Sequence, residues 1–162
     1  MSHTRTFALH GDLASPADLR RDMGDPEWVD AYPDWKRGLA PLLLELDVHE
    51  WINLVGYSSG GSMISALTWR LDNIRCAVLY EAPNLQPIIP GGNFPVLMIW
   101  NDRGRVRWPE SIDTYWDWRV NHPVDVFGGR GRHIAFSWRP PFLRHGWDQS
   151  LNDRIAAWIQ SK

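Results

Sequence analysis

The sequence is poor in cysteine, in long apolar runs and in net charge. Its 162 residues include one cysteine, Cys76, so an internal disulfide is excluded and a reducing compartment is expected. No stretch approaches the roughly 20 consecutive apolar residues that a membrane-spanning helix needs. Lys and Arg number 17 against 19 Asp and Glu, a formal charge of −2. Because a surface that binds nucleic acid needs a basic excess, neither DNA nor RNA is an expected partner.

The chain also lacks the marks of a targeting segment or of a second domain. Met1–Arg5 is polar and runs directly into an apolar strand, not into the hydrophobic segment of a signal peptide. Together with the missing membrane span, this favours a cytoplasmic protein. No repeat, linker or low-complexity tract interrupts the sequence, and its length allows one domain to bury a sizeable core. We therefore expect a single domain over residues 1–162.

Short apolar runs alternate with helical patterns along the chain. Ser15 and Pro16 are typical of the N-cap and first position of a helix. The alternation predicts an α/β fold with a mostly parallel sheet of about six strands and helices on both faces. The expected strands are Thr6–Leu9, Trp28–Tyr32, Trp51–Val55, Arg75–Tyr80, Pro95–Trp100 and Val124–Phe127. The expected helices are Pro16–Met23, Asp34–Leu46, Gly61–Leu71, Pro109–Val120 and Gln149–Gln160.

Residues 56–60 form a G-x-S-x-G pattern with Ser58 at its centre. The pattern lies between a predicted strand and a predicted helix, where a serine takes a tight, strained turn and its hydroxyl projects above the sheet edge. The flanking glycines remove Cβ atoms that would collide in such a turn. The amide of Ser59, at the helix start, would face an oxygen that becomes negative during acyl transfer. Ser58 is therefore the candidate nucleophile.

A serine nucleophile needs a base, and an imidazole is suited to this because its usual pKa lies near neutrality. His133 is the best candidate among the six histidines, because it follows the glycine-rich run 127–132. That run would let the loop bend back over the sheet edge. A loop histidine bonded to backbone is its alternative role, and His145 is the reserve candidate for the base.

Two carboxylates compete for the acid that orients the base. Asp102 follows the strand predicted to end at Trp100, which gives the chain order Ser, Asp, His. Glu81 follows the strand predicted to end at Tyr80, and its alternative role is that of a solvated loop acid. We favour Asp102 and keep Glu81 as the alternative.

The loop after the first strand is the expected source of a second oxyanion donor. The backbone N–H of Asp12 is the first choice and that of Gly11 the next. The Asp12 carboxylate must then point away, since a neighbouring negative charge would raise the energy of the oxyanion. His10 is expected to shape this loop and, with Tyr57 and Trp100, to contact the substrate.

These motifs resemble the α/β-hydrolase superfamily, and their order covers nearly the whole chain. GYSSGG at 56–61 is similar to the nucleophile elbow of dienelactone-hydrolase-like, small carboxylesterase and acyl-thioesterase members, and GGRGRHIAF at 128–136 to their histidine segment. The resemblance implies a minimal α/β-hydrolase fold without a lid domain. It also implies hydrolysis of an ester or thioester through an acyl-serine intermediate, with no metal or organic cofactor. Dienelactone hydrolases carry cysteine at the elbow, so Ser58 favours a serine esterase.

Two departures from the family leave alternatives open. The family's acid loop usually carries its aspartate past a glycine, and the comparable place here is near Gly104, beyond Asp102. The chain is also much shorter than most members. A non-catalytic binding protein with this fold, and acyl transfer to an acceptor other than water, are therefore competing hypotheses. Missing edge strands would leave a sheet edge exposed, so a homodimer paired through that edge is one hypothesis and a minimal monomer is the other.

Overall fold

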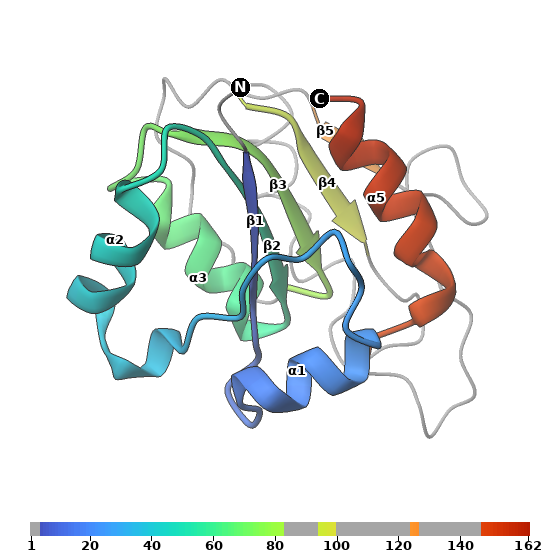
Figure 1. Ribbon diagram of the computed structural model, residues 1–162, viewed down its shortest axis with the longest axis horizontal. Coiled ribbons are helices and arrows are strands. Elements are labelled where there is room, and N and C mark those ends of the chain that lie inside the picture. The colour runs from blue at the N-terminus through green and yellow to red at the C-terminus, as the bar shows by residue number, and fades with distance from the viewer. Residues whose placement is uncertain (1–3, 83–93, 100–123, 127–146) are drawn as a thin grey trace.

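The computed structural model describes residues 4–82, 94–99, 124–126 (backbone only) and 147–162. Within these ranges the chain forms a five-stranded sheet in the order β1-β2-β3-β4-β5, and each neighbouring pair is parallel (Figure 1). The predicted parallel α/β architecture is confirmed. The strands are β1 (Arg5–Leu9), β2 (Ile52–Tyr57), β3 (Ile74–Tyr80), β4 (Val96–Ile99) and β5 (Val124–Val126).

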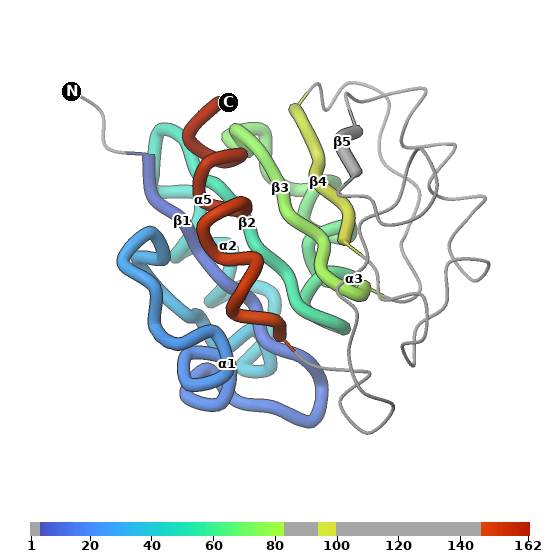
Figure 2. The backbone as a smooth tube through the Cα atoms, turned by 90° about the vertical axis from the view of Figure 1, so that its right-hand side faces the viewer, coloured from blue at the N-terminus to red at the C-terminus, as the bar shows by residue number. Residues whose placement is uncertain are grey.

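Helices cover both faces of the sheet, because successive residues of each strand point to opposite sides. Phe7 and Leu9 of β1 pack with residues of α2 (Leu39–Asp47) and α3 (Ser59–Leu67). Ala8, between them, packs with residues of α1 (Pro16–Met23) and α5 (Asn152–Gln160). Figure 2 shows α5 in front of the sheet and α2 behind it. Each residue of β2 is buried, as a strand covered on both sides requires.

Cys76 lies in β3 and is fully buried, as expected for a small hydrophobic residue. Burial raises the pKa of its thiol to about 12. No helix of the described residues is both long enough and apolar enough to cross a membrane.

The first predicted helix forms with the boundaries expected. Ser15 is its N-cap, and a reciprocal pair of bonds with Asp18 completes a capping box. The Asp18 amide donates to Ser15 Oγ at 3.2 Å, and the Ser15 amide donates to Asp18 Oδ2 at 2.9 Å. The Ser15 hydroxyl also donates to Asp18 Oδ2, at 2.8 Å, and the hydrogen bonds from the hydroxyl and from the Ser15 amide lower the pKa of the Asp18 carboxyl. Gly24 ends the helix with φ of 74°.

The helix predicted over Asp34–Leu46 is wrong in its first part. A short 3₁₀ helix, η1 (Trp35–Arg37), forms instead, with Asp34 as its N-cap and Gly38 as its C-cap. Gly38 has φ of 121° and ψ of 159°, a conformation that interrupts the helix before α2. Residues 34–37 are therefore free to contact other parts of the fold.

The strand predicted over Trp28–Tyr32 is also wrong. Within the described residues this segment makes one isolated parallel bridge, between Ala31 and Phe7. The Asp30 carboxylate accepts a hydrogen bond from the Thr6 amide at 2.7 Å. A side chain therefore binds a backbone N–H that would pair with a backbone carbonyl in a regular β-ladder. The carbonyl of Thr6 accepts the Asp30 amide at 2.9 Å. These bonds cover the outer edge of β1. The homodimer through a sheet edge stays a prediction, and pairing at β1 would have to displace these bonds.

The remaining boundaries differ by a few residues. β2 continues through Gly56 and Tyr57, beyond the predicted end at Val55. The following helix then starts at Ser59, earlier than expected, and ends at Leu67. The terminal helix opens with a 3₁₀ turn, η4 (Gln149–Leu151). The helix predicted over Pro109–Val120 lies outside the described residues.

Candidate active site

Ser58 alone makes the turn between β2 and α3. β2 ends at Tyr57 and α3 begins at Ser59. The backbone of Ser58 has φ of 54° and ψ of −125°, a conformation that costs about 1–3 kcal/mol in a residue with a Cβ. Its amide donates to the Tyr80 carbonyl at 2.8 Å, and its carbonyl accepts the Gly61 amide at 2.9 Å. The strained turn predicted for Ser58 is therefore present and is held from both sides.

Two glycines after Ser58 let the start of α3 sit directly against the sheet. A Cβ added at Gly60 would overlap the Leu9 carbonyl group, and would lie 2.7 Å from the His10 carbonyl oxygen. A Cβ added at Gly61 would collide with the Ala82 side chain. Because these neighbours include backbone atoms, close packing requires glycine at positions 60 and 61, the last two positions of the G-x-S-x-G-G pattern.

The start of α3 supplies a donor next to the nucleophile. As the first residue of the helix, Ser59 has an amide with no acceptor inside α3, and the positive end of the helix dipole adds to it. This is the placement that the predicted oxyanion role of Ser59 needs.

The loop after β1 lies against Ser58. Leu9 pairs with Gly56 in the sheet, which brings the ends of β1 and β2 to the same edge. A Cβ added at Gly11 would lie 3.3 Å from Ser58 Cβ and 3.7 Å from Ser58 Oγ. Asp12, the next residue, is exposed. The structure thus brings the predicted oxyanion loop next to the predicted nucleophile.

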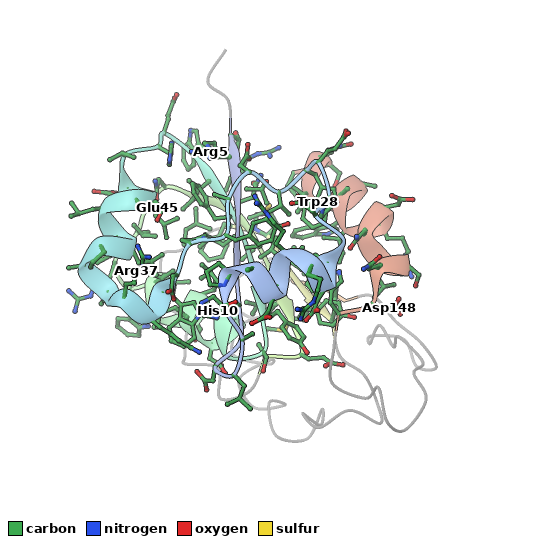
Figure 3. The ribbon with its side chains drawn as sticks, turned by 60° about the horizontal axis from the view of Figure 1, so that its bottom comes forward. Arg5, His10, Trp28, Arg37, Glu45 and Asp148 are labelled. Carbon is green, nitrogen blue, oxygen red and sulfur yellow. The ribbon has the colours of Figure 1, made fainter. Side chains whose placement is uncertain are left out.

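His10 is buried beneath this loop. Its Nδ1 donates to the Gly11 carbonyl at 2.8 Å, and its Nε2 lies 3.2 Å from Asp34 Oδ1. Its ring stacks on Trp35 with centroids 5.5 Å apart. Figure 3 shows His10 at the end of β1 opposite to Arg5. Both ring nitrogens have partners within the protein. This geometry fits the expected loop-shaping role of His10, and it does not support the other expected role, direct contact with the substrate.

Asp34 is charged in this arrangement. Partial desolvation raises the pKa of its carboxyl, but hydrogen bonds from His10 and from the Lys36 amide outweigh that effect and hold the pKa below its usual value. Asp34 therefore presents a negatively charged oxygen to His10 Nε2.

Glu81 follows β3 directly and is fully buried. Its backbone φ is 48°, and its amide donates to the Ile99 carbonyl at 2.7 Å. The alternative role as a solvated loop acid is therefore wrong. Tyr57 pairs with Tyr80 in the sheet, so Glu81 directly follows the strand next to the elbow and lies at the same edge of the sheet as Ser58.

Tyr57 is largely buried in an aromatic cluster. Its ring centroid lies 5.8 Å from that of Tyr80 and 6.3 Å from that of Trp147. Tyr80 and Trp147 stack at 4.4 Å, and the Tyr80 hydroxyl accepts the Asp148 amide at 3.0 Å. The cluster ties the start of the C-terminal segment to β3. Substrate contact by Tyr57 stays a prediction, and only a small part of its surface is accessible for it.

Several predicted site residues lie outside the described ranges: His133, His145, Asp102 and Trp100. At one edge of the sheet, the structure brings together the predicted nucleophile Ser58, the three residues predicted as oxyanion donors and the alternative acid Glu81. In the described part of the chain, no group of His, Cys, Asp and Glu is arranged to hold a metal ion. Sequence reasoning overlooked Asp34, Trp35 and Lys36, because it placed them inside a longer helix.

Comparisons with known proteins rest on structure alone, since neither a protein-family model nor a curated protein matches the sequence. The carboxylesterase of Bacillus cereus is 14% identical, with a TM-score of 0.65 over 99% of this chain and 89% of that one. A structure of YahD with malic acid is 10% identical, with a TM-score of 0.67 over 98% and 93% of the two chains.

A third solved structure comes from work on LipS and LipT, described as metagenome-derived lipolytic enzymes. It is 12% identical, with a TM-score of 0.66 over 99% of this chain and 95% of that one. At such identities the likeness concerns the fold alone, and it agrees with the parallel sheet flanked by helices. The chain has the α/β-hydrolase fold.

Proposed function

We propose that this protein is a serine hydrolase that cleaves carboxylic esters, or thioesters, of small acyl substrates. The observation that carries the proposal is the conformation of Ser58, a strained residue between β2 and the start of α3, with Gly11 packed against its side chain. Strain of this kind is kept where the surrounding structure enforces it, and such sites are often functional. The names of the neighbours, which include a carboxylesterase and lipolytic enzymes, support the same chemistry.

In the proposed reaction, Ser58 Oγ attacks the acyl carbon while His133 takes the hydroxyl proton. The carbonyl oxygen becomes negative and accepts hydrogen bonds from the amides of Ser59 and of Asp12 or Gly11. Collapse of the tetrahedral intermediate expels the alcohol or thiol, which receives the proton from His133. Water, activated by the same imidazole, then attacks the acyl-serine ester and releases the acid and Ser58. Asp102, or Glu81, would hold the imidazole in the productive tautomer.

The exposure of Leu13 favours a substrate that carries an apolar group. It follows Asp12 in the loop next to Ser58, and 95% of its surface is exposed. The turn that presents it is closed by a bond from the Ala14 amide to the Gly11 carbonyl at 3.2 Å. An apolar acyl or alcohol group that covers Leu13 would remove its surface from water.

Labelling with a fluorophosphonate tests the activation of the serine. The folded protein should react at Ser58 within minutes, because an activated serine attacks phosphorus as it attacks an acyl carbon. Peptide mass spectrometry of the adduct identifies the labelled residue, and urea-unfolded protein is the control. If folded protein is left unlabelled at Ser58, the non-catalytic binding hypothesis is favoured instead.

The identity of the acid is tested by two amide substitutions, Asp102→Asn and Glu81→Gln. Substitution of the residue that serves as the acid should lower kcat about 10⁴-fold, the loss seen on the equivalent change in a serine protease. The other substitution should change kcat per folded molecule only slightly. Turnover of a short nitrophenyl ester is measured beside circular dichroism, because Glu81 is buried. Glu45→Gln, on the exposed side of α2, is the matched control. Full activity in both variants would rule out both carboxylates.

A further inference from the structure

The carbonyl oxygens of the loop after β1 are held by side chains from a distant part of the chain. We call residues 10–14 the oxyanion loop. Trp35 Nε1 donates to the His10 carbonyl at 2.7 Å. Lys36 Nζ donates to the Asp12 carbonyl and, at 3.1 Å, to the Ala14 carbonyl. Each of these contacts joins residues at least 22 positions apart in the sequence.

Hydrogen bonds to the carbonyls of His10 and Gly11 determine the direction of the Gly11 and Asp12 amides. A trans peptide group is planar, and its N–H points opposite to its C=O. The Gly11 amide shares a peptide group with the His10 carbonyl, so anchoring that carbonyl on Trp35 turns the Gly11 N–H away from η1. The Asp12 amide shares a peptide group with the Gly11 carbonyl, which accepts from His10 Nδ1 and from the Ala14 amide. Both candidate oxyanion donors are thus oriented through their carbonyl side.

The anchoring side chains are themselves held in place. Asp34 caps η1 by accepting the Lys36 amide at 3.2 Å, and it binds His10 through the same oxygen. The stack of Trp35 on His10 keeps the indole under the loop. A carbonyl that accepts a hydrogen bond also polarises its peptide group, which strengthens the N–H as a donor.

We propose that Trp35 and Lys36 are positioning residues of the oxyanion hole. Through the His10 carbonyl, Trp35 aims the Gly11 amide at the developing oxyanion. Through the Asp12 and Ala14 carbonyls, Lys36 holds in place the part of the oxyanion loop that carries the Asp12 amide. This rests on the proposed hydrolase function, and it assigns a positioning role in catalysis to side chains of η1.

Two substitutions remove one contact each with little change of shape. Trp35→Phe keeps an aromatic ring on His10 and deletes the indole N–H. Lys36→Met keeps the aliphatic stem and deletes the ammonium group. Arg37→Met is the matched control, because Arg37 belongs to the same turn, is 80% exposed and has a side-chain contact with Asp34 at 3.8 Å. Lys36→Arg is the conservative variant and should retain most of the wild-type activity.

The kinetic result separates a positioning role from a structural one. Removal of a whole oxyanion donor costs 10²–10³ in kcat, so loss of a positioning contact should cost less, about tenfold in each variant. KM for a neutral nitrophenyl ester should stay within about twofold, because the contact acts on the transition state. The affinity for a boronic acid, which mimics the tetrahedral intermediate, should fall in parallel with kcat. An unchanged kcat, or a higher KM with unchanged kcat, would overturn the proposal.

A second measurement keeps the proposal independent of whether the protein hydrolyses esters. In ¹⁵N relaxation measurements, the order parameters of the Gly11 and Asp12 amides should fall in Trp35→Phe and Lys36→Met and stay unchanged in Arg37→Met. If they do not fall, the loop is not positioned by these residues, whatever the activity. If they fall but wild-type protein neither hydrolyses esters nor reacts with fluorophosphonate, the positioning of the loop stands while the proposed function, and the catalytic role with it, fails.

Discussion

Ser58→Ala should abolish fluorophosphonate labelling and lower ester turnover by roughly 10⁴- to 10⁶-fold, as removal of a catalytic serine does in serine proteases. The hydroxyl is the only group lost, and without it no acyl-enzyme can form. The substitution should leave the fold intact, because the bonds that hold the turn come from backbone atoms: the Ser58 amide to Tyr80, and the Ser58 carbonyl to Gly61. The measurement is kcat/KM for a short nitrophenyl ester, with circular dichroism as the check on folding.

A serine elsewhere in the fold is the control for this prediction. Ser161 lies at the end of α5 and is exposed, and its hydroxyl donates to the Trp158 carbonyl at 2.7 Å. Ser161→Ala should leave labelling and turnover at the wild-type level. If Ser58→Ala retains more than a few per cent of wild-type turnover while Ser161→Ala behaves as expected, then Ser58 is not the nucleophile and the proposed function is wrong.

Gly60→Ala should destabilise the protein by about 3 kcal/mol or more, toward the upper end of what overpacking costs. The added methyl group would overlap the Leu9 carbonyl group and lie 2.7 Å from the His10 carbonyl oxygen. Backbone atoms at the end of a strand that is paired in the sheet cannot rotate aside as a flexible side chain can. α3 would have to move away from β1, and the turn at Ser58 would move with it. We therefore expect loss of both stability and turnover, measured by urea denaturation and by kcat per folded molecule.

Gly24→Ala separates this steric effect from the general effect of replacing a glycine. Gly24 ends α1 with φ of 74°, and an added Cβ would meet the end of the flexible Gln149 side chain at 3.0 Å. A left-handed conformation costs roughly 1–2 kcal/mol in alanine, so stability should fall by that amount with turnover retained. Equal losses of stability in the two variants, with turnover unaffected in Gly60→Ala, would contradict the tight contact between α3 and β1.

The strands and the elbow could be predicted from local patterns. Continuous apolar runs such as Val96–Ile99 mark strands buried on both faces, and Ser15 with Pro16 marks a helix start. The glycines around Ser58 predict a turn that other residues cannot make. These features depend on residues within a few positions of one another, which is why a single sequence was enough.

The errors arose where distant contacts outweigh local preference. Residues 34–37 have the apolar spacing of a helix, yet Asp34 and Trp35 are bound to His10, and Gly38 separates them from α2. The segment around Asp30 has the composition of a strand, but its carboxylate binds the Thr6 amide. Propensity is a weak guide at such positions, because tertiary hydrogen bonds are worth more than the difference between helix and extended chain.

By itself, the sequence determined the class of fold, the turn at Ser58 and the identity of the candidate nucleophile, since each follows from the periodicity and sterics of neighbouring residues. Only the tertiary structure decided that Glu81 is buried next to the elbow, that His10 is held from below by Asp34, and that Lys36 reaches the carbonyls of the oxyanion loop. Burial and hydrogen bonding depend on which segments the fold brings together. A contact between residues more than 20 positions apart cannot be recognised from the local sequence around either residue.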